Sequence, residues 1–320
     1  MPVGEEKKLQ HNLIWHDEHH LQIGTTNFFL TLDWETADTT ESTPETFLLI
    51  KNQPLVETIF QHLPERIDNM IEFGIFKGGS IAFYEELFSP KRLVGVDIKP
   101  NRVAALDEYL ERRSATNRVR LYHGIDQGDA EALKVIAREN FSTEPVDLVI
   151  DDGSHRYGPS KTTLNRFLPL VRPGGIYLIE DWGWAHWPLR HGPHSGQFDD
   201  QQNPLTKLIF EVVMLTASHG ELISQVHIDP SRAFIVRGWK SMATYKDFNI
   251  DDTYRTKLWR FDFAQTNLLD GDQSEPTNIS TAQNRPRVDL IDGWRRMAPL
   301  SIRTKVPPSL ASWVKRHIRR

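Results

Sequence analysis

Short apolar runs that alternate with helical patterns constrain the fold of this chain more than any other feature of its sequence. Residues 146–152 and 175–181 read VDLVIDD and GIYLIED, and each run is short, apolar and ended by carboxylates. Such runs are typical of strands that are buried on both faces of a parallel sheet. We therefore expect an open α/β sheet that binds its ligands where the strands end.

The alternation of strand and helix patterns extends over about residues 54–238. Strands joined by helices of about ten residues indicate right-handed crossovers, and hence a doubly wound sheet. The prediction is a seven-stranded sheet that ends in an antiparallel hairpin. The expected strands are 70–75, 92–98, 119–124, 146–152 and 175–181, followed by the hairpin strands 222–229 and 231–238; the expected helices are 54–63, 80–88, 102–112, 129–140, 162–171 and 204–218.

Composition excludes several classes of site. The chain has no cysteine, which rules out disulfides, iron–sulfur clusters, thiolate zinc sites and cysteine nucleophiles. Its first residues lack the apolar core of a signal peptide, and no apolar run approaches the roughly 18 residues of a membrane span. We expect a cytoplasmic protein.

The net charge is −5, yet residues 295–320 carry eight cations and no acid. A basic segment confined to one end, away from the predicted site, argues against a nucleic-acid partner. At this end Leu310, Trp313, Val314 and Ile318 fall on one face of a predicted helix. That helix either rests on an anionic membrane surface or docks on the protein with its cations favoured by the helix dipole.

A glycine-rich turn, FGIFKGGS, follows the first strand of the predicted sheet at residues 73–80. Glycine lets a backbone approach a ligand, and the N-terminus of the next helix supplies unpaired N–H groups. The spacing differs from the GxGxxG of dinucleotide sites, and the preceding acid suits a cationic ligand better than a pyrophosphate. S-adenosylmethionine, with its sulfonium and ammonium, fits; the alternative is a tight turn without a ligand. The residues assigned to this cofactor are Glu72, Gly74, Lys77, Gly78 and Ser80.

Three further polar residues follow the next two strands. Asp97 ends the second strand, where a carboxylate can accept hydrogen bonds from two ribose hydroxyls. Asp126 and Gln127 follow the third strand and are predicted to lie at the adenine edge of the cofactor. The alternative for this segment is a helix N-cap made by Asp126 or Asp129.

Carboxylates and one histidine follow the two strands named at the outset. Asp152, Glu180, Asp181 and His155 form a hard, oxygen-rich set that suits Mg²⁺ or Mn²⁺ better than zinc or copper. The alternative is that these aspartates cap turns and the histidine bonds to backbone. Asp151 is assigned to the cofactor, with an inward-turned or turn-capping side chain as the other possibility.

Tryptophans and histidines are frequent just after the fifth strand. Trp182, Trp184 and Trp187 either stack on a sugar ring beside the metal or pack their loop onto the core. A zinc site made from the histidines of this loop, His186, His191 and His194, is disfavoured by their irregular spacing.

Taken together, these motifs resemble the class I S-adenosylmethionine-dependent methyltransferases, over about residues 54–238. More narrowly they resemble the metal-dependent macrolide sugar O-methyltransferases of the mycinamicin and macrocin type, and the cephalosporin-hydroxylase-like and rhamnosyl O-methyltransferase groups. The resemblance implies a Rossmann-like fold, magnesium bound by Asp152, Glu180 and Asp181, and His155 as the base. Changes in composition along the chain divide it into an N-terminal cap segment (1–45), a methyltransferase domain (46–240), and a C-terminal extension with a polar flap and a basic terminal helix (241–320).

The predicted function is S-adenosylmethionine- and Mg²⁺-dependent O-methylation of a sugar hydroxyl on a glycosylated natural product, glycolipid or polysaccharide. Three alternatives remain open: a metal-independent methyltransferase with another small-molecule acceptor, a hydroxylase-like enzyme, and a non-catalytic relative. A non-haem iron oxygenase wants two histidines and one carboxylate, the reverse of this set. We expect a homo-oligomer that binds no nucleic acid.

Overall fold

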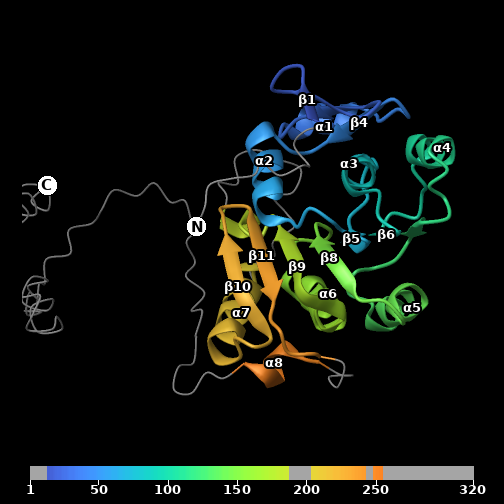
Figure 1. Cartoon of the computed structure of the whole chain (residues 1–320). Helices are drawn as coiled ribbons and strands as arrows, with labels where there is room; N and C mark the ends of the chain where they lie inside the picture. Colours follow the sequence, from blue (N-terminus) through green and yellow to red (C-terminus); the bar gives the residue numbers. More distant parts are fainter. Residues whose placement is uncertain (1–12, 187–202, 243–247, 255–320) are drawn as a thin grey trace, which may run out of the picture. The chain divides into compact units, whose positions relative to one another are not determined.

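The computed structural model describes residues 13–186, 203–242 and 248–254 (Figure 1). Its larger sheet has the strand order β10-β11-β9-β8-β5-β6-β7. The five strands from β9 to β7 are parallel, while β11 runs antiparallel to β9 and β10 antiparallel to β11. The predicted doubly wound sheet with a terminal antiparallel hairpin is confirmed. The bounds are β5 (Asn69–Phe73), β6 (Arg92–Asp97), β7 (Val119–His123), β8 (Val146–Asp151), β9 (Val171–Glu180), β10 (Ile223–Ile228) and β11 (Arg232–Arg237).

Helices cover both faces of this sheet, with α2, α3 and α4 on one side and α5, α6 and α7 on the other (Figure 1). Successive residues of a strand face opposite sides of the sheet. Met70 of β5 therefore packs with α2, α3 and α4, and Ile71 packs with α5, α6 and α7. The bounds are α2 (Gln53–His62), α3 (Gly79–Phe88), α4 (Ala104–Arg112), α5 (Ala130–Phe141), α6 (Tyr157–Phe167) and α7 (Thr206–Ser218).

One helix begins earlier than its sequence pattern predicts. The expected start was residue 162, whereas α6 begins at Tyr157. Its first turn contains Pro159, which is tolerated there because the first N–H groups of a helix have no intrahelical partner. A 3₁₀ turn at Leu168–Leu170 then leads directly into β9.

A second, four-stranded sheet forms from the N-terminal residues, in the order β1-β2-β3-β4. β1 (Leu13–Trp15), β2 (His20–Ile23) and β3 (Thr26–Leu30) form a meander, and β4 (Thr46–Leu49) returns parallel to β3. The short helix α1 (Trp34–Thr39) connects the last two strands. The small sheet therefore extends past residue 45 and ends only a few residues before α2.

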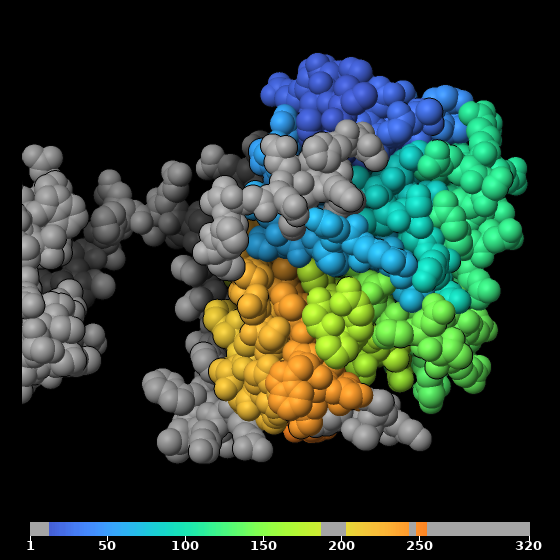
Figure 2. Space-filling view, viewed as in Figure 1, coloured from blue at the N-terminus to red at the C-terminus, as the bar shows by residue number. Residues whose placement is uncertain are grey.

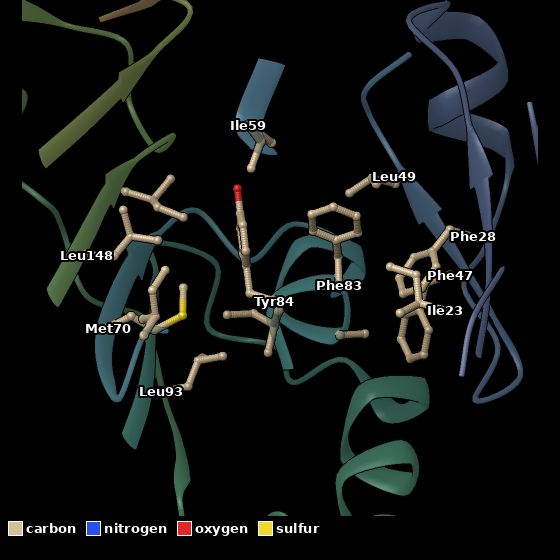
Figure 3. Close-up of a cluster of buried hydrophobic side chains, with 14 of the residues drawn as sticks. Ile23, Phe28, Phe47, Leu49, Ile59, Met70, Phe83, Tyr84, Leu93 and Leu148 are labelled. Carbon is tan, nitrogen blue, oxygen red and sulfur yellow. The ribbon is translucent and has the colours of Figure 1, made fainter. Parts of the chain in front are cut away.

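The small sheet packs on α3, which separates it from the larger sheet. The rings of Phe28 in β3 and Phe83 in α3 meet edge to face, with centroids 5.7 Å apart. In Figure 3 Phe83 lies beside the small-sheet residues, while Tyr84 of the same helix lies toward Met70 of the larger sheet. In the space-filling view, the N-terminal residues of the small sheet, in dark blue, lie at the top of the view (Figure 2). We find three layers on this side: small sheet, helix, large sheet.

A close backbone contact fixes how the two layers meet. A Cβ built on Gly79, the first residue of α3, would lie 1.8 Å from the carbonyl oxygen of Leu48 in β4. Only glycine allows this approach. The chain continues from Leu48 into Lys51, so the same contact sets the position of that lysine.

Several predictions fall wholly or partly outside the described residues. The predicted basic terminal helix does so, together with Trp187, His191 and His194. Of the predicted flap, the structure describes residues 241–242 and 248–254, which include the short helix α8 (Ile250–Thr253). No helix in the described part of the chain has the length and apolar character that spanning a membrane requires.

Candidate metal and cofactor site

The site lies where the strand order of the larger sheet reverses direction. Strand β5 has β6 on one side and β8 on the other, and the pairing aligns Phe73 with Val96 and with Asp151. On the far side of β8, Asp151 is aligned with Ile179. The residues that follow, Gly74, Asp97, Asp152 and Glu180, therefore emerge in one row, at the point where doubly wound sheets bind their ligands.

Three of the predicted side chains gather into a cluster that could hold a metal ion. Asp152, His155 and Asp181 each offer a ligand atom, and these atoms lie within 4.8 Å of one another. The His155 Nε2 is 3.9 Å from Asp152 Oδ1, and Asp181 Oδ1 accepts a hydrogen bond of 2.9 Å from the Ser231 hydroxyl. Oxygen-rich ligands of this kind fit Mg²⁺ or Mn²⁺.

Glu180, the fourth predicted residue, is paired with a lysine that sequence reasoning missed. Lys51 is buried, and its Nζ lies 2.6 Å from Glu180 Oε2 and 4.0 Å from Asp152 Oδ2. The other oxygen of Glu180, Oε1, is buried without a hydrogen-bond partner among the described residues. Nothing in the local sequence marks Lys51, because it follows a strand that pairs only with the distant N-terminal segment.

Burial raises the pKa of both aspartates in this cluster. Burial, with repulsion from Glu180, raises the pKa of the Asp152 carboxyl well above its usual range. Burial also raises the pKa of Asp181, although attraction to His155 offsets part of this effect. Burial would lower the pKa of the Lys51 ammonium, but Glu180 and Asp152 outweigh it and raise that pKa. One lysine does not neutralise these buried acids, and a divalent cation bound among them would stabilise their charged forms.

Backbone strain is concentrated at the same place. His155, Asp181 and Phe76 have positive φ angles of 53°, 55° and 47°. Left-handed backbone in a residue other than glycine costs on the order of 1 kcal/mol, and such strain tends to gather at functional sites. The surrounding structure must hold these three residues in place.

The glycine turn is held by packing and by Asp97. A Cβ on Gly74 would lie 2.1 Å from the Asp152 carbonyl oxygen, so this glycine lets the turn approach the metal cluster. Asp97 Oδ2 accepts hydrogen bonds from the N–H groups of Ile75 and Phe76 at 2.8 and 2.9 Å. Its Oδ1 accepts one from Lys99 N–H at 2.7 Å. The carboxylate predicted to bind ribose also fixes the shape of the turn.

Glu72 lies at the base of this turn. Burial raises the pKa of the Glu72 carboxyl to about 8, although a hydrogen bond from Ser80 and the charge of Lys51 oppose the shift. Its Oε2 has no hydrogen-bond partner in the described part of the chain. A buried acid with an unpaired oxygen suits a cationic ligand group, as the sequence indicated.

The Lys77 side chain is directed away from the turn. Its ammonium donates to the carbonyl oxygens of Ala37, Asp38 and Thr40 at the end of α1, at 3.0, 2.7 and 2.7 Å. Contact between Lys77 and the cofactor stays a prediction. The side chain instead ties α1 to the turn.

The Asp151 side chain is turned inward, which was the sequence-based alternative to a cofactor contact. It is buried and accepts hydrogen bonds from Gln127, from the Ser160 hydroxyl at 3.3 Å and from the Tyr177 hydroxyl at 3.3 Å. These bonds engage both carboxylate oxygens, and contact between Asp151 and the cofactor stays a prediction. Gln127 also accepts a hydrogen bond from Ser154 N–H at 2.9 Å, which fixes the loop that carries the cluster.

Asp126 makes a local turn. Its Oδ1 accepts a hydrogen bond from Gly128 N–H at 2.7 Å and the residue is exposed. The N-cap of α5 is Asp129, whose side chain accepts from Glu131 and Ala132 N–H. The capping alternative thus holds for Asp129, and contact between Asp126 and adenine stays a prediction.

Aromatic side chains line the site, including one from the N-terminal segment. The rings of His155 and Trp184 have centroids 4.3 Å apart, and Trp34 of α1 meets both Trp184 and Phe76 edge to face at 5.9 and 6.4 Å. Trp184 is buried, and Trp182 Nε1 donates to the Asp229 carbonyl at 2.9 Å. These two tryptophans pack their loop onto the protein, whereas Trp34 was not anticipated.

Comparison with known proteins confirms the predicted resemblance. Residues 71–182 match a family model described as a methyltransferase domain. The mycinamicin VI 2''-O-methyltransferase of Micromonospora griseorubida is 36% identical over 157 residues, which are 49% of this chain and 34% of that protein. The demethylmacrocin O-methyltransferase of Streptomyces fradiae is 29% identical over 179 residues, 51% of this chain and 41% of that protein. This chain thus spans well under half of either relative.

A solved structure gives a further likeness. It is the MycE methyltransferase of the mycinamycin pathway in complex with Mg, SAH and mycinamycin VI, which is 28% identical with a TM-score of 0.43. The match covers 57% of this chain and 48% of that one.

Proposed function

We propose that this chain is an S-adenosylmethionine- and Mg²⁺-dependent O-methyltransferase that acts on a sugar hydroxyl of a glycosylated acceptor. One observation carries the proposal: the cluster of Asp152, His155 and Asp181 adjoins the glycine turn at the reversal of strand order. An electrophilic cofactor and a site for orienting a hydroxyl are thereby brought to one edge of the sheet. The match of residues 71–182 to a methyltransferase domain supports this proposal.

The cofactor would be held by two acids of different character. Glu72, with its unpaired buried oxygen, would accept hydrogen bonds from the ammonium of the methionine tail. Asp97 would accept from the ribose hydroxyls with the lone pairs that its backbone contacts leave available. Both acids lie at the carboxyl ends of neighbouring parallel strands, the arrangement by which this sheet type binds adenosine ligands.

The metal ion would be bound by Asp152 and Asp181 of the cluster, with the unpaired Oε1 of Glu180 as a further ligand atom. A bound divalent cation orients a hydroxyl and makes its proton more acidic. His155 would then accept that proton at Nε2. In the transfer, the sugar oxygen would form a bond to the methyl carbon of S-adenosylmethionine as the carbon–sulfur bond breaks, leaving S-adenosylhomocysteine. The His155 imidazolium would then return its proton to water.

A sugar acceptor is supported by the names of the relatives and by the aromatic lining. Curated relatives include methyltransferases of rhamnosyl tetracenomycin and olivosyl-oleandolide, as well as of mycinamicin. Aromatic faces suit the apolar faces of sugar rings, and Trp34 and Phe76 are partly exposed beside the cluster. A glycosylated natural product is the proposed acceptor class, ahead of a glycolipid or polysaccharide.

Calorimetric titration with S-adenosylmethionine, with and without Mg²⁺ and with NAD as the control, tests the cofactor part of the proposal. We expect micromolar binding of S-adenosylmethionine and none of NAD. Methyl transfer to a panel of glycosylated macrolides and polyketides, with and without EDTA, tests the remainder. Methyl transfer that survives EDTA would favour the metal-independent alternative, and binding of NAD alone would remove the methyltransferase proposal.

A further inference from the structure

Lys51 has the surroundings of a component of the metal site, although it lies outside the matched methyltransferase domain. Its side chain is only 4% exposed, and it reaches Glu180 Oε2 at 2.6 Å and Asp152 Oδ2 at 4.0 Å. Asp152 follows β8 and Glu180 ends β9 of the larger sheet, whereas Lys51 follows β4 of the small sheet. The lysine therefore connects the small sheet to the larger sheet at the candidate metal cluster.

The hydrogen bond of Lys51 makes the two oxygens of Glu180 unequal. Oε2 is taken by the ammonium, and Oε1 is buried without a partner in the part of the chain that the structure describes. Glu180 as a whole is only 6% exposed, so bulk water has little access to Oε1 as a hydrogen-bond donor. A buried carboxylate oxygen without a donor is energetically unfavourable. An unpaired carboxylate oxygen held in this way is preorganised for a cation.

A direct chemical role for Lys51 does not follow from this geometry. An ammonium has no lone pair and cannot bind a metal ion. What it can do is hold two carboxylates that would otherwise repel each other in a buried place. Outer partners that fix the orientation of metal ligands commonly change metal affinity 10- to 100-fold when they are removed.

We propose that Lys51 is a positioning residue that fixes Glu180 through Oε2 and presents Glu180 Oε1 to the metal ion. This inference rests on the proposed function, since it assumes a divalent cation at the carboxylate cluster. It adds a residue that follows the small N-terminal sheet to a site whose predicted ligands all lie at the strand ends of the larger sheet. Removal of the lysine should weaken metal binding, even though a positive charge leaves the site.

The test is metal affinity, measured without acceptor or turnover. Full-length wild type and Lys51→Met are titrated with Mn²⁺ by paramagnetic resonance and with Mg²⁺ by calorimetry. We expect Lys51→Met to bind about 10-fold more weakly or worse. Lys51→Arg keeps the charge and one donor to Oε2, and it should stay within about threefold of wild type if the larger guanidinium is accommodated.

Lys161→Met is the matched control. Lys161 is a largely buried lysine that pairs with Glu211 and Asp251 instead of the cluster. Its removal should lower the melting temperature and leave metal affinity within about twofold of wild type. Melting curves of all variants show whether the protein remains folded, and the comparison with Lys161→Met separates a general loss of stability from an effect on the site.

A double-mutant cycle with Glu180→Gln shows whether Lys51 acts through Glu180. In the Glu180→Gln background, Lys51→Met should change metal affinity by less than about threefold. Full additivity would overturn the proposal, because Lys51 would then act independently of Glu180. Tighter or unchanged metal binding by the single variant would also overturn it, since the lysine would then compete with the ion. If the wild type binds S-adenosylmethionine but neither metal, the Lys51 proposal and the metal dependence both fall while a methyltransferase remains.

Discussion

Substitution of Gly79 by alanine tests the contact that joins the small sheet to the helix behind the cofactor turn. The added Cβ would lie 1.8 Å from the Leu48 carbonyl oxygen and 2.8 Å from its carbon, where real Cβ contacts stay beyond 3.0 Å. The obstructing atoms are backbone, so no side-chain rotation relieves them. Either β4 or the start of α3 has to move by about 1 Å or more, which is overpacking in a buried place.

The expected loss is about 3 kcal/mol of unfolding free energy, the upper end of the range for overpacked cores, because two backbone segments are involved. For a domain of this size that corresponds to a fall of about 9 °C in melting temperature. The assay is urea and thermal unfolding followed by circular dichroism. Metal affinity should fall as well, since Lys51 follows β4.

Gly158→Ala is the matched control, because it also places alanine in the first turn of a helix. A Cβ on Gly158 meets nothing within 4 Å, so the higher helix propensity of alanine should add stability, by at most about 1 kcal/mol. The two substitutions should therefore change stability in opposite directions. A Gly79→Ala protein within about 0.5 kcal/mol of wild type would refute the close approach of the two layers.

Five further substitutions separate the roles of individual side chains. Asp152→Asn should weaken metal binding by more than about 10-fold. Asp151→Asn should keep the metal affinity and lose about 1–3 kcal/mol of stability, because Asp151 accepts buried hydrogen bonds. An equal loss of metal affinity in both variants would contradict the assignment. Burial raises the pKa of Glu72 from 4.5 to about 8, so the folded state keeps a proton that the unfolded chain has lost, and stability declines as pH rises through this window. The melting temperature of Glu72→Gln relative to that of wild type should therefore rise from pH 5 to pH 8, measured without cofactor. A difference in melting temperature that does not change with pH would count against a buried acid. His155→Gln should lower kcat by about 10²- to 10⁴-fold with metal affinity kept, while lost metal binding would make His155 a ligand instead of the base. Trp34→Ala should raise KM for a glycosylated acceptor about fivefold and leave the affinity for S-adenosylmethionine unchanged, and an effect confined to cofactor affinity would place this ring elsewhere.

The larger sheet could be predicted because each of its strands is bounded by local signals. Apolar runs such as residues 146–152 are short, β-branched and closed by acids, and helical patterns separate them. Parallel register then places strand-end residues in one row, which is why Asp152 and Asp181 could be assigned to one cluster from sequence. The alternation of strands and helices thus predicts which strand-end residues lie next to one another.

The contributions of the N-terminal segment could not be predicted in the same way. Strand β4 is a four-residue run whose partner, β3, lies across a helix and a polar loop, so it shows no clear periodicity of its own. Lys51 and Trp34 reach the site only because that strand pairs as it does. The direction of individual side chains was also beyond the sequence, since adjacent residues such as Asp151 and Asp152 point to different partners.

The bond between Lys77 and the end of α1 has a consequence for the order of events in a catalytic cycle. Lys77 belongs to the cofactor turn, and α1 carries Trp34, which faces the aromatic lining of the site. An adjustment of the turn on binding a ligand would be passed to Trp34 through this bond, and linkage would make the coupling reciprocal. We expect an ordered kinetic mechanism in which the nucleoside binds first and shapes the surface that the second substrate meets, with initial-rate patterns and product inhibition as the observable signature.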